Sequence, residues 1–230
     1  MKKIIKDIRY YGPINNTEPL TKKRYSMPKS YNCIGVRYTL KLRELEFYLN
    51  DYSHLYIDLK PAIKMNESIF SDKKDQYHPW YRNVDYGYSI EKMNNLSDEK
   101  KLREIQKITK DVLLKYCCEN KEDIEKVNRV YKELIKTGEL TDIFYRTLKS
   151  GKKEVKFILN VLDNGEVNVF ARCNDLFKNN IFVKKLDDIS IVNYALGRIK
   201  TNNGVLTIIP KKNRGSEYYK LEEIKIKIDN

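Results

Sequence analysis

The chain has 230 residues, of which 41% are hydrophobic and 33% charged, and its mean hydropathy is -0.66. A chain of this length forms one large domain or two small ones and can bury a substantial core. The composition excludes collagen-like and disordered chains, and no stretch approaches the ~18 uninterrupted apolar residues of a membrane span. We therefore expect a soluble protein that makes no membrane contact.

The chain is strongly basic, with 45 Lys and Arg against 32 Asp and Glu and a net charge of +13. Such a surplus favours anionic partners, including nucleic acid. However, Lys, Asn, Ile and Tyr together make up 97 residues, and Ala occurs only three times, which is typical of an AT-rich genome. The charge is also spread along the chain, with net values of +6 in 1–95, +2 in 96–150 and +5 in 151–230. Basicity alone therefore does not identify a nucleic-acid-binding protein.

The cysteines favour a reducing compartment. The first residues are basic, but Lys6, Asp7 and Arg9 interrupt the apolar run that a secretory signal needs. Adjacent cysteines on a helix are poorly placed to pair, and no CxxC motif is present to suggest zinc. We expect a cytoplasmic protein whose thiols are reduced, without a metal or cofactor. The four cysteines are Cys33, Cys117, Cys118 and Cys173.

The N-terminal third is rich in strand signals. Several short segments combine aromatic and β-branched residues, and two of them alternate apolar with polar positions. The gaps between them are short, which is typical of antiparallel neighbours, so we predict an antiparallel meander. The predicted strands are 2–11, 31–41, 44–49, 54–60 and 84–90.

The middle of the chain is predicted to be helical. Leu102, Ile105 and Ile108 begin an apolar stripe at three- and four-residue spacing over 97–118, and Ser97 is a suitable N-cap. A second stripe, which includes Leu134, runs through 122–137 and ends before Gly138. The short joint between the two segments predicts an antiparallel helical hairpin.

The C-terminal third returns to strands. Asn164-Gly165 lies between 154–162 and 166–172, and Asn203-Gly204 lies between 192–200 and 205–210. Asn-Gly between alternating segments is the strongest local hairpin signal. A last strand is expected at Ile224–Ile228. Segregated strands and helices predict an α+β fold, divided as 1–95, a Tyr-rich β-subdomain, 96–150, the helical hairpin, and 151–230, a second β-subdomain.

One loop concentrates the residue types of contact surfaces: Tyr77, His78, Trp80, Tyr81 and Arg82 lie within six positions. Pro79 stiffens the segment, and rigid aromatic side chains and Arg dominate protein interfaces. We therefore take these five residues as candidate binding residues. The alternative is that Trp80, the only tryptophan, folds back to close one end of the sheet.

No catalytic motif is present: the chain lacks a Walker loop, a GxGxxG turn and a GxSxG elbow. A metal-dependent nuclease would need an acid-x-Lys pair on a strand with a second acid upstream, as in Asp58, Lys60 and Asp51. Such triplets occur here about as often as the composition predicts, so the nuclease is only a minor alternative.

The leading hypothesis is a non-enzymatic protein of an AT-rich bacterium or its phage that binds another protein, as toxin-immunity proteins and phage-encoded inhibitors do. The net charge favours an acidic toxin or effector as its target. The alternative is nucleic-acid binding by a sheet face that carries tyrosines with Arg9, Arg37 and Arg43, because 12 of the 18 tyrosines lie in residues 1–90. The RNP-like pattern of RNA-binding sheets is absent.

Overall fold

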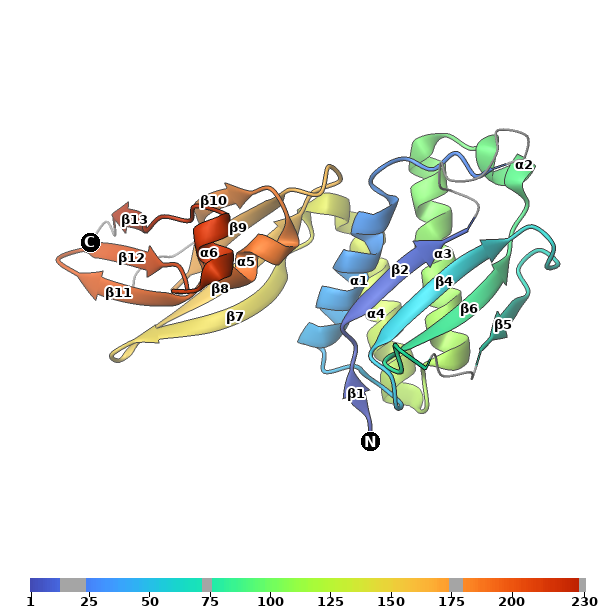
Figure 1. Ribbon diagram of the computed structural model, residues 1–230, viewed down its shortest axis with the longest axis horizontal. Coiled ribbons are helices and arrows are strands. Elements are labelled where there is room, and N and C mark those ends of the chain that lie inside the picture. Colours follow the sequence, from blue (N-terminus) through green and yellow to red (C-terminus); the bar gives the residue numbers. More distant parts are fainter. Residues whose placement is uncertain (13–23, 72–75, 174–179, 228–230) are drawn as a thin grey trace. The chain divides into compact units, whose positions relative to one another are not determined.

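The structure is a computed structural model that describes residues 1–12, 24–71, 76–173 and 180–227 (Figure 1). The chain divides into two compact units, Met1–Gly138 and Glu139–Asn230, and each is described here by itself. The predicted α+β class is confirmed, because both helices and mainly antiparallel strand pairs are present. The division at Gly138 puts the helical hairpin in the first unit, whereas the sequence suggested boundaries at 95 and 150.

The first unit contains a four-stranded sheet in the order β2-β4-β6-β5. Strands β2, β4 and β6 are parallel, and only the edge strand β5 runs antiparallel to its neighbour. The predicted antiparallel meander is therefore wrong for these strands. A separate short pair joins β1 to β3. The strands are β1 (Lys3–Ile4), β2 (Asp7–Tyr11), β3 (Tyr48–Leu49), β4 (His54–Lys60), β5 (Ser68–Phe70) and β6 (Tyr81–Gly87).

The error has a physical origin in helix α1 (Tyr31–Glu44), which replaces the strand predicted at 31–41. Of the strand predicted at 44–49, only Tyr48–Leu49 is present, as β3. Many residues of the α1 segment favour strands, but its buried residues follow the spacing of a helix. Ile34, Tyr38 and Leu42, which are four residues apart, are all buried. A helix between β2 and β4 provides the crossover that parallel strands need. Gly35 permits the close packing, because a Cβ there would lie 2.1 Å from the carbonyl oxygen of Ile8 in β2.

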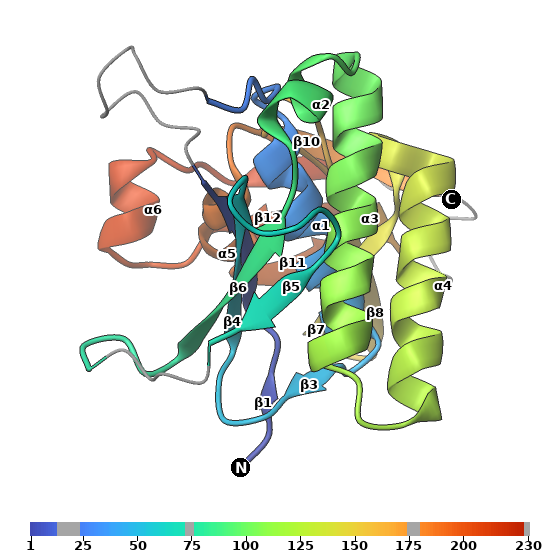
Figure 2. The same ribbon diagram turned by 90° about the vertical axis from the view of Figure 1, so that its right-hand side faces the viewer.

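The predicted helical hairpin is confirmed as α3 (Asp98–Tyr116) and α4 (Lys121–Thr137). The side chains of Ser97 and Asn120 cap the two helices by accepting hydrogen bonds from Lys100 N and Asp123 N. A short helix, α2 (Ile90–Asn94), precedes the hairpin. In the first unit the helices lie behind the sheet in Figure 1 and beside it in Figure 2.

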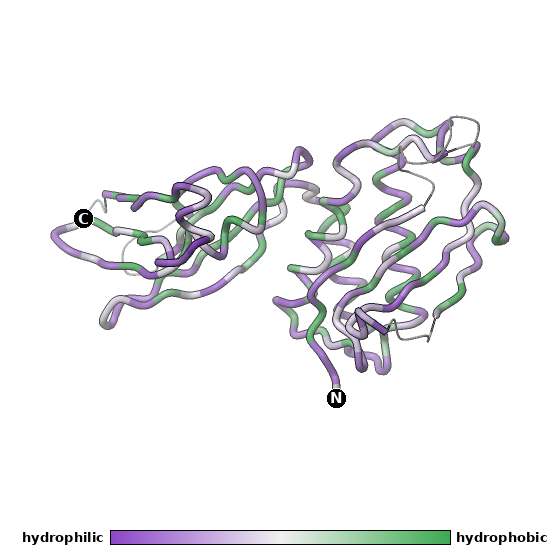
Figure 3. Tube along the Cα trace, viewed as in Figure 1, coloured by the Kyte–Doolittle hydropathy of each residue, from purple (hydrophilic) through white to green (hydrophobic). Residues whose placement is uncertain are grey.

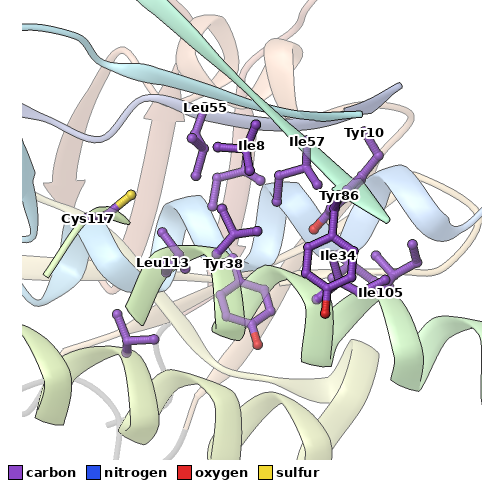
Figure 4. Close-up of a cluster of buried hydrophobic side chains, with 14 of the residues drawn as sticks. Ile8, Tyr10, Ile34, Tyr38, Leu55, Ile57, Tyr86, Ile105, Leu113 and Cys117 are labelled. Atoms are coloured by element: carbon purple, nitrogen blue, oxygen red, sulfur yellow. The ribbon is translucent and has the colours of Figure 1, made fainter. Parts of the chain in front are cut away.

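The core of the first unit lies between the sheet and these helices. Figure 4 shows side chains of the strands pointing toward those of α1 and α3. Two buried tyrosines meet polar partners on α3: the hydroxyl of Tyr10 lies 2.8 Å from Oγ1 of Thr109, and that of Tyr38 donates to the carbonyl of Gln106 at 3.0 Å. Their aromatic rings are thus buried without leaving the hydroxyls unsatisfied.

The second unit is built on antiparallel strands. One sheet has the order β10-β9-β8-β7 and the other β11-β12-β13. Both predicted Asn-Gly hairpins are confirmed: the turn between β11 and β12 has positive φ at Asn203 (45°) and Gly204 (70°). Hydrophobic and hydrophilic residues alternate along many of the strands (Figure 3). The strands are β7 (Ile143–Ser150), β8 (Lys153–Val161), β9 (Val167–Arg172), β10 (Ile181–Leu186), β11 (Arg198–Asn202), β12 (Val205–Ile209) and β13 (Ile224–Lys227).

The helices of the second unit are short. Helix α5 (Ile189–Ala195) replaces the beginning of the strand that the sequence suggested from residue 192. Helix α6 (Arg214–Tyr218) lies between β12 and β13. A 3-10 turn at Gly138–Leu140 joins the two units along the chain. None of the four cysteines forms a disulfide, and three of them, Cys33, Cys117 and Cys173, are buried.

Candidate functional site

The candidate site lies on the sheet of the first unit, on the face turned away from α1 and α3. Alternate positions of β4 are buried, beginning at Leu55, while the positions between them are partly exposed. The parallel register places Tyr11, Asp58 and Asp85 opposite one another on three neighbouring strands. This face of the sheet therefore carries polar and aromatic side chains.

Aromatic rings from three strands contact one another on this face. The rings of Tyr56 and Tyr81 stack, with centroids 4.8 Å apart and planes inclined by 23°. Tyr11 lies on the other side of Tyr56, at a centroid distance of 5.2 Å. Stacked and tilted rings at these distances attract one another, so the three tyrosines form a continuous aromatic surface.

The loop before β6 extends the aromatic surface. The rings of His78 and Trp80 meet edge to face, with centroids 5.0 Å apart. The carbonyl oxygen of Trp80 accepts hydrogen bonds from the backbone N–H groups of Ser53 (2.8 Å) and His54 (3.1 Å). The Trp80 backbone is thus tied to the start of β4, although its residue is 40% exposed. That exposure does not fit the alternative in which Trp80 closes one end of the sheet.

Arg82 fixes the same loop from the buried side. Only 3% of Arg82 is exposed, and its Nη2 donates to both carboxylate oxygens of Asp51 at 2.9 Å. Its Nη1 donates to the carbonyls of Pro79 (3.1 Å) and Tyr81 (2.7 Å). Its guanidinium also lies over the ring of Tyr52, 5.4 Å from the centroid. Arg82 therefore holds the loop and cannot itself serve as an exposed contact residue, which corrects the prediction.

The aromatic surface and the loop before β6 border a groove of about 690 Å³. That volume is within the usual range for ligand pockets. Every residue that lines it comes from a strand or a loop of the first unit, and the set combines aromatic, amide, hydroxyl and acidic side chains. The lining residues are Tyr11, Tyr56, Asp58, Ser71, His78, Trp80, Tyr81, Asn83 and Asp85.

The charge of the groove differs from that of the unit around it. Residues 1–138 contain 28 Lys and Arg but only 20 Asp and Glu. Among the described residues that line the groove, however, the charged ones are Asp58 and Asp85, and none is Lys or Arg. Asp58 is paired with Lys60, the next outward-facing residue of β4. Within the described chain, Asp85 has neither an ion pair nor a side-chain hydrogen bond.

Burial changes the pKa of two ring-bearing groups on this face. It raises the pKa of Tyr56 above its ordinary value, so this hydroxyl is neutral at physiological pH. It lowers the pKa of His54, in spite of the nearby carboxylate of Asp7, which favours the neutral imidazole. Ser53 Oγ lies 2.9 Å from Nδ1 of His54.

The structure brings together three of the five predicted binding residues. His78, Trp80 and Tyr81 line the groove, while Tyr77 is 78% exposed and lies outside its lining. Four partners on neighbouring strands, Tyr11, Tyr56, Asn83 and Asp85, were not predicted as site residues, and Asp58 was considered only for a nuclease. The alternation in 54–60 had already placed Tyr56 and Asp58 on one face, but the parallel register that joins them to Tyr11 and Asp85 was not predicted.

The Tyr- and Arg-bearing sheet face that the nucleic-acid hypothesis needs is smaller than expected. Arg37 is buried in α1 and Arg43 is exposed at the end of the same helix, so of the three arginines only Arg9 lies on the sheet. Of the eight tyrosines in the predicted strands, four are buried and two, Tyr11 and Tyr56, lie on the candidate face. The buried tyrosines are Tyr10, Tyr38, Tyr86 and Tyr88.

The triplet considered for a nuclease does not assemble. Asp58 and Lys60 share a face of β4 as expected, but Asp51 precedes that strand and pairs with Arg82. In the described parts of the chain, no cluster of three or more His, Cys, Asp or Glu residues is suited to hold a metal ion. Nor does any described helix combine the length and apolar character needed to cross a membrane.

No protein-family model matches this chain, and comparisons with curated proteins and with solved structures find no match either.

Proposed function

We propose that this protein is a non-enzymatic cytoplasmic binding protein that acts by stoichiometric contact with another protein, and that the groove face of β2, β4 and β6 makes the contact. The toxin-immunity type of inhibitor is the specific form of this proposal. The observation that supports it most is Trp80, which is exposed beside the Tyr56–Tyr81 stack yet has its backbone tied to the start of β4.

The physical argument rests on preorganisation. Tyr and Trp side chains provide a large contact area, and they lose little conformational entropy when they are already held in place. Here Arg82 holds the loop through two carbonyls, and stacking holds the rings of Tyr56 and Tyr81. Interfaces are enriched in Tyr and Trp and depleted in Lys, and the described lining of the groove has three tyrosines and Trp80 but no Lys.

Single-stranded nucleic acid is the second candidate, because the tyrosine surface could stack bases and Arg9 lies over the Tyr56 ring at 6.0 Å from its centroid. The carboxylates of Asp58 and Asp85 oppose it, since they repel the phosphates that supply most of the affinity for nucleic acid. A protein partner therefore fits the groove better.

The test places a photo-reactive residue in the groove. We expect Trp80→p-benzoylphenylalanine, irradiated in the cells that naturally contain the protein, to form a discrete adduct with one other protein. The same substitution at Ile135, which is 41% exposed on α4, is the matched control and should give no such adduct. Adducts that disappear on nuclease treatment, or equal yields at the two positions, would contradict the proposal.

The energetic role of Trp80 can then be measured with the captured partner. Trp80→Ala should weaken binding by about 2 kcal/mol or more, or roughly 30-fold, while the melting temperature changes little. Ile135→Ala should leave the affinity unchanged. If Trp80→Ala lowered stability by about 3–5 kcal/mol instead, Trp80 would be a packing residue and the proposal would lose its main support.

A further inference from the structure

The charge within the groove indicates what it binds. The whole chain is basic, yet the charged residues that line the groove are two aspartates. Lys60 already pairs with Oδ2 of Asp58, so Asp58 is partly neutralised. Asp85 makes no ion pair within the described chain, and it lies directly opposite Asp58 on the neighbouring strand. Lys60 also interacts electrostatically with Asp85, so one lysine serves two carboxylates and the groove keeps a net negative charge.

Aromatic rings line the same groove as these carboxylates. Tyr56, Tyr81 and Trp80 line the same groove, and the faces of such rings attract cations. The chain shows this attraction at the edge of the site, where the guanidinium of Arg9 lies 6.0 Å from the centroid of Tyr56. A carboxylate beside aromatic rings fits a planar cation well, because a guanidinium can stack on a ring and donate to a carboxylate with its edge.

From this arrangement we infer that the groove binds an arginine side chain presented by the protein partner, with Asp85 as the anionic contact and the tyrosine rings as its walls. This inference rests on the proposed function. Asp58 adds a second carboxylate, whose Oδ1 is buried without a hydrogen-bond partner in the described chain. A partner that is acidic overall, as the net charge favours, can still present a single arginine at this point.

Two model peptides that differ only in charge test the inference. In Ac-Gly-Arg-Gly-NH2 the side chain is cationic, whereas in Ac-Gly-citrulline-Gly-NH2 it has nearly the same shape and is neutral. Binding can be followed by NMR through the indole N–H signal of Trp80, which is unambiguous because the chain has one tryptophan. We expect saturable millimolar binding of the arginine peptide and about tenfold weaker binding of the citrulline peptide.

Variants locate the interaction. Asp85→Asn keeps the shape of the side chain and should reduce the affinity for the arginine peptide to about that for the citrulline peptide. Glu125→Gln, at an exposed position of α4 on the helical side of the unit, is the charge-matched control and should change nothing. The remaining amide signals of each variant show whether it is folded, so a folding defect cannot be mistaken for lost recognition.

Three outcomes would overturn the inference: equal binding of the two peptides, no effect of Asp85→Asn, or a shift of the Trp80 signal by the oligonucleotide dT8 but not by the arginine peptide. The first two would leave the proposed function intact, because cross-linking at position 80 tests that function independently. The third would overturn both in favour of single-stranded nucleic acid.

Discussion

A single residue, Arg82, links the buried core to the exposed groove. Its chemistry resembles that of a contact residue, but its burial and its hydrogen bonds to Asp51, Pro79 and Tyr81 make it a positioning residue. An arginine can satisfy several carbonyl and carboxylate oxygens at once, which explains why this side chain is suited to the base of a loop.

Arg82→Ala should destabilise the first unit by about 3 kcal/mol, because it leaves three backbone and carboxylate partners without their donor and removes a buried side chain. Denaturant unfolding followed by Trp80 fluorescence measures the change, since Trp80 lies in the same unit. Arg129→Ala, at an exposed position of α4, is the control and should stay within about 0.5 kcal/mol of the parent. Equal effects of the two substitutions would show that Arg82 does not hold the loop.

Adjacent residues of one strand show how the same residue type serves two roles. Tyr10 and Tyr11 are neighbours in β2, yet Tyr10 is 3% exposed and bonded to α3 while Tyr11 is 41% exposed and lines the groove. Side chains alternate between the two faces of a strand, so consecutive tyrosines must point in opposite directions. The sequence supports this alternation, but only the packed helices decide which face becomes the core.

At the scale of elements, the helical hairpin packs one stripe of each helix inward. Ile105 in α3 and Leu134 in α4 are at most 1% exposed, while Ile135, the next residue of α4, is 41% exposed. A turn of 100° per residue separates Leu134 from Ile135, so the two neighbours face different surroundings. This pair therefore provides a matched test of the packing.

Ile105→Ala and Leu134→Ala should each lower the free energy of unfolding by about 2–5 kcal/mol, because each leaves a cavity in the core. Ile135→Ala should change it by less than about 1 kcal/mol, since the side chain already contacts solvent. Chemical denaturation of the three variants under identical conditions makes the comparison. A cost below about 0.5 kcal/mol at both buried positions would refute the packing described for the hairpin.

At the scale of the whole molecule, net charge and local charge have different consequences. The surplus of +13 attracts anions over distances of about a Debye length, whereas the groove itself is acidic. Diffuse basic charge gives weak, nonspecific attraction to nucleic acid, and salt removes it because the gain from releasing counterions falls as the salt concentration rises.

Gel-shift assays with single-stranded and duplex DNA should therefore show complexes at ~50 mM salt that disappear by ~0.3 M salt, without sequence preference. Asp85→Asn should not strengthen them more than Glu125→Gln, because each substitution removes one negative charge. A complex that survives ~0.3 M salt and discriminates between sequences would favour the nucleic-acid alternative over protein binding.

The sequence by itself determined the elements that rest on local signals. The stripe from Leu102, the cap at Ser97 and the two Asn-Gly turns depend on residues close together in the chain, and the structure has the corresponding helices and hairpins. The loop around Trp80 was also found this way, because His78, Trp80 and Tyr81 are local in sequence. Arg82 was misassigned because its partner Asp51 is 31 positions away.

Only the tertiary structure decided the conformation of 31–44 and everything that follows from it. Its β-prone residues favoured a strand, but burial of Ile34, Tyr38 and Leu42 against the sheet stabilises a helix there. That helix makes β2 and β4 parallel, and the parallel register brings Tyr11, Tyr56 and Asp85 into one groove. Contacts between distant segments form only when the chain packs, so local propensity could not place these residues together.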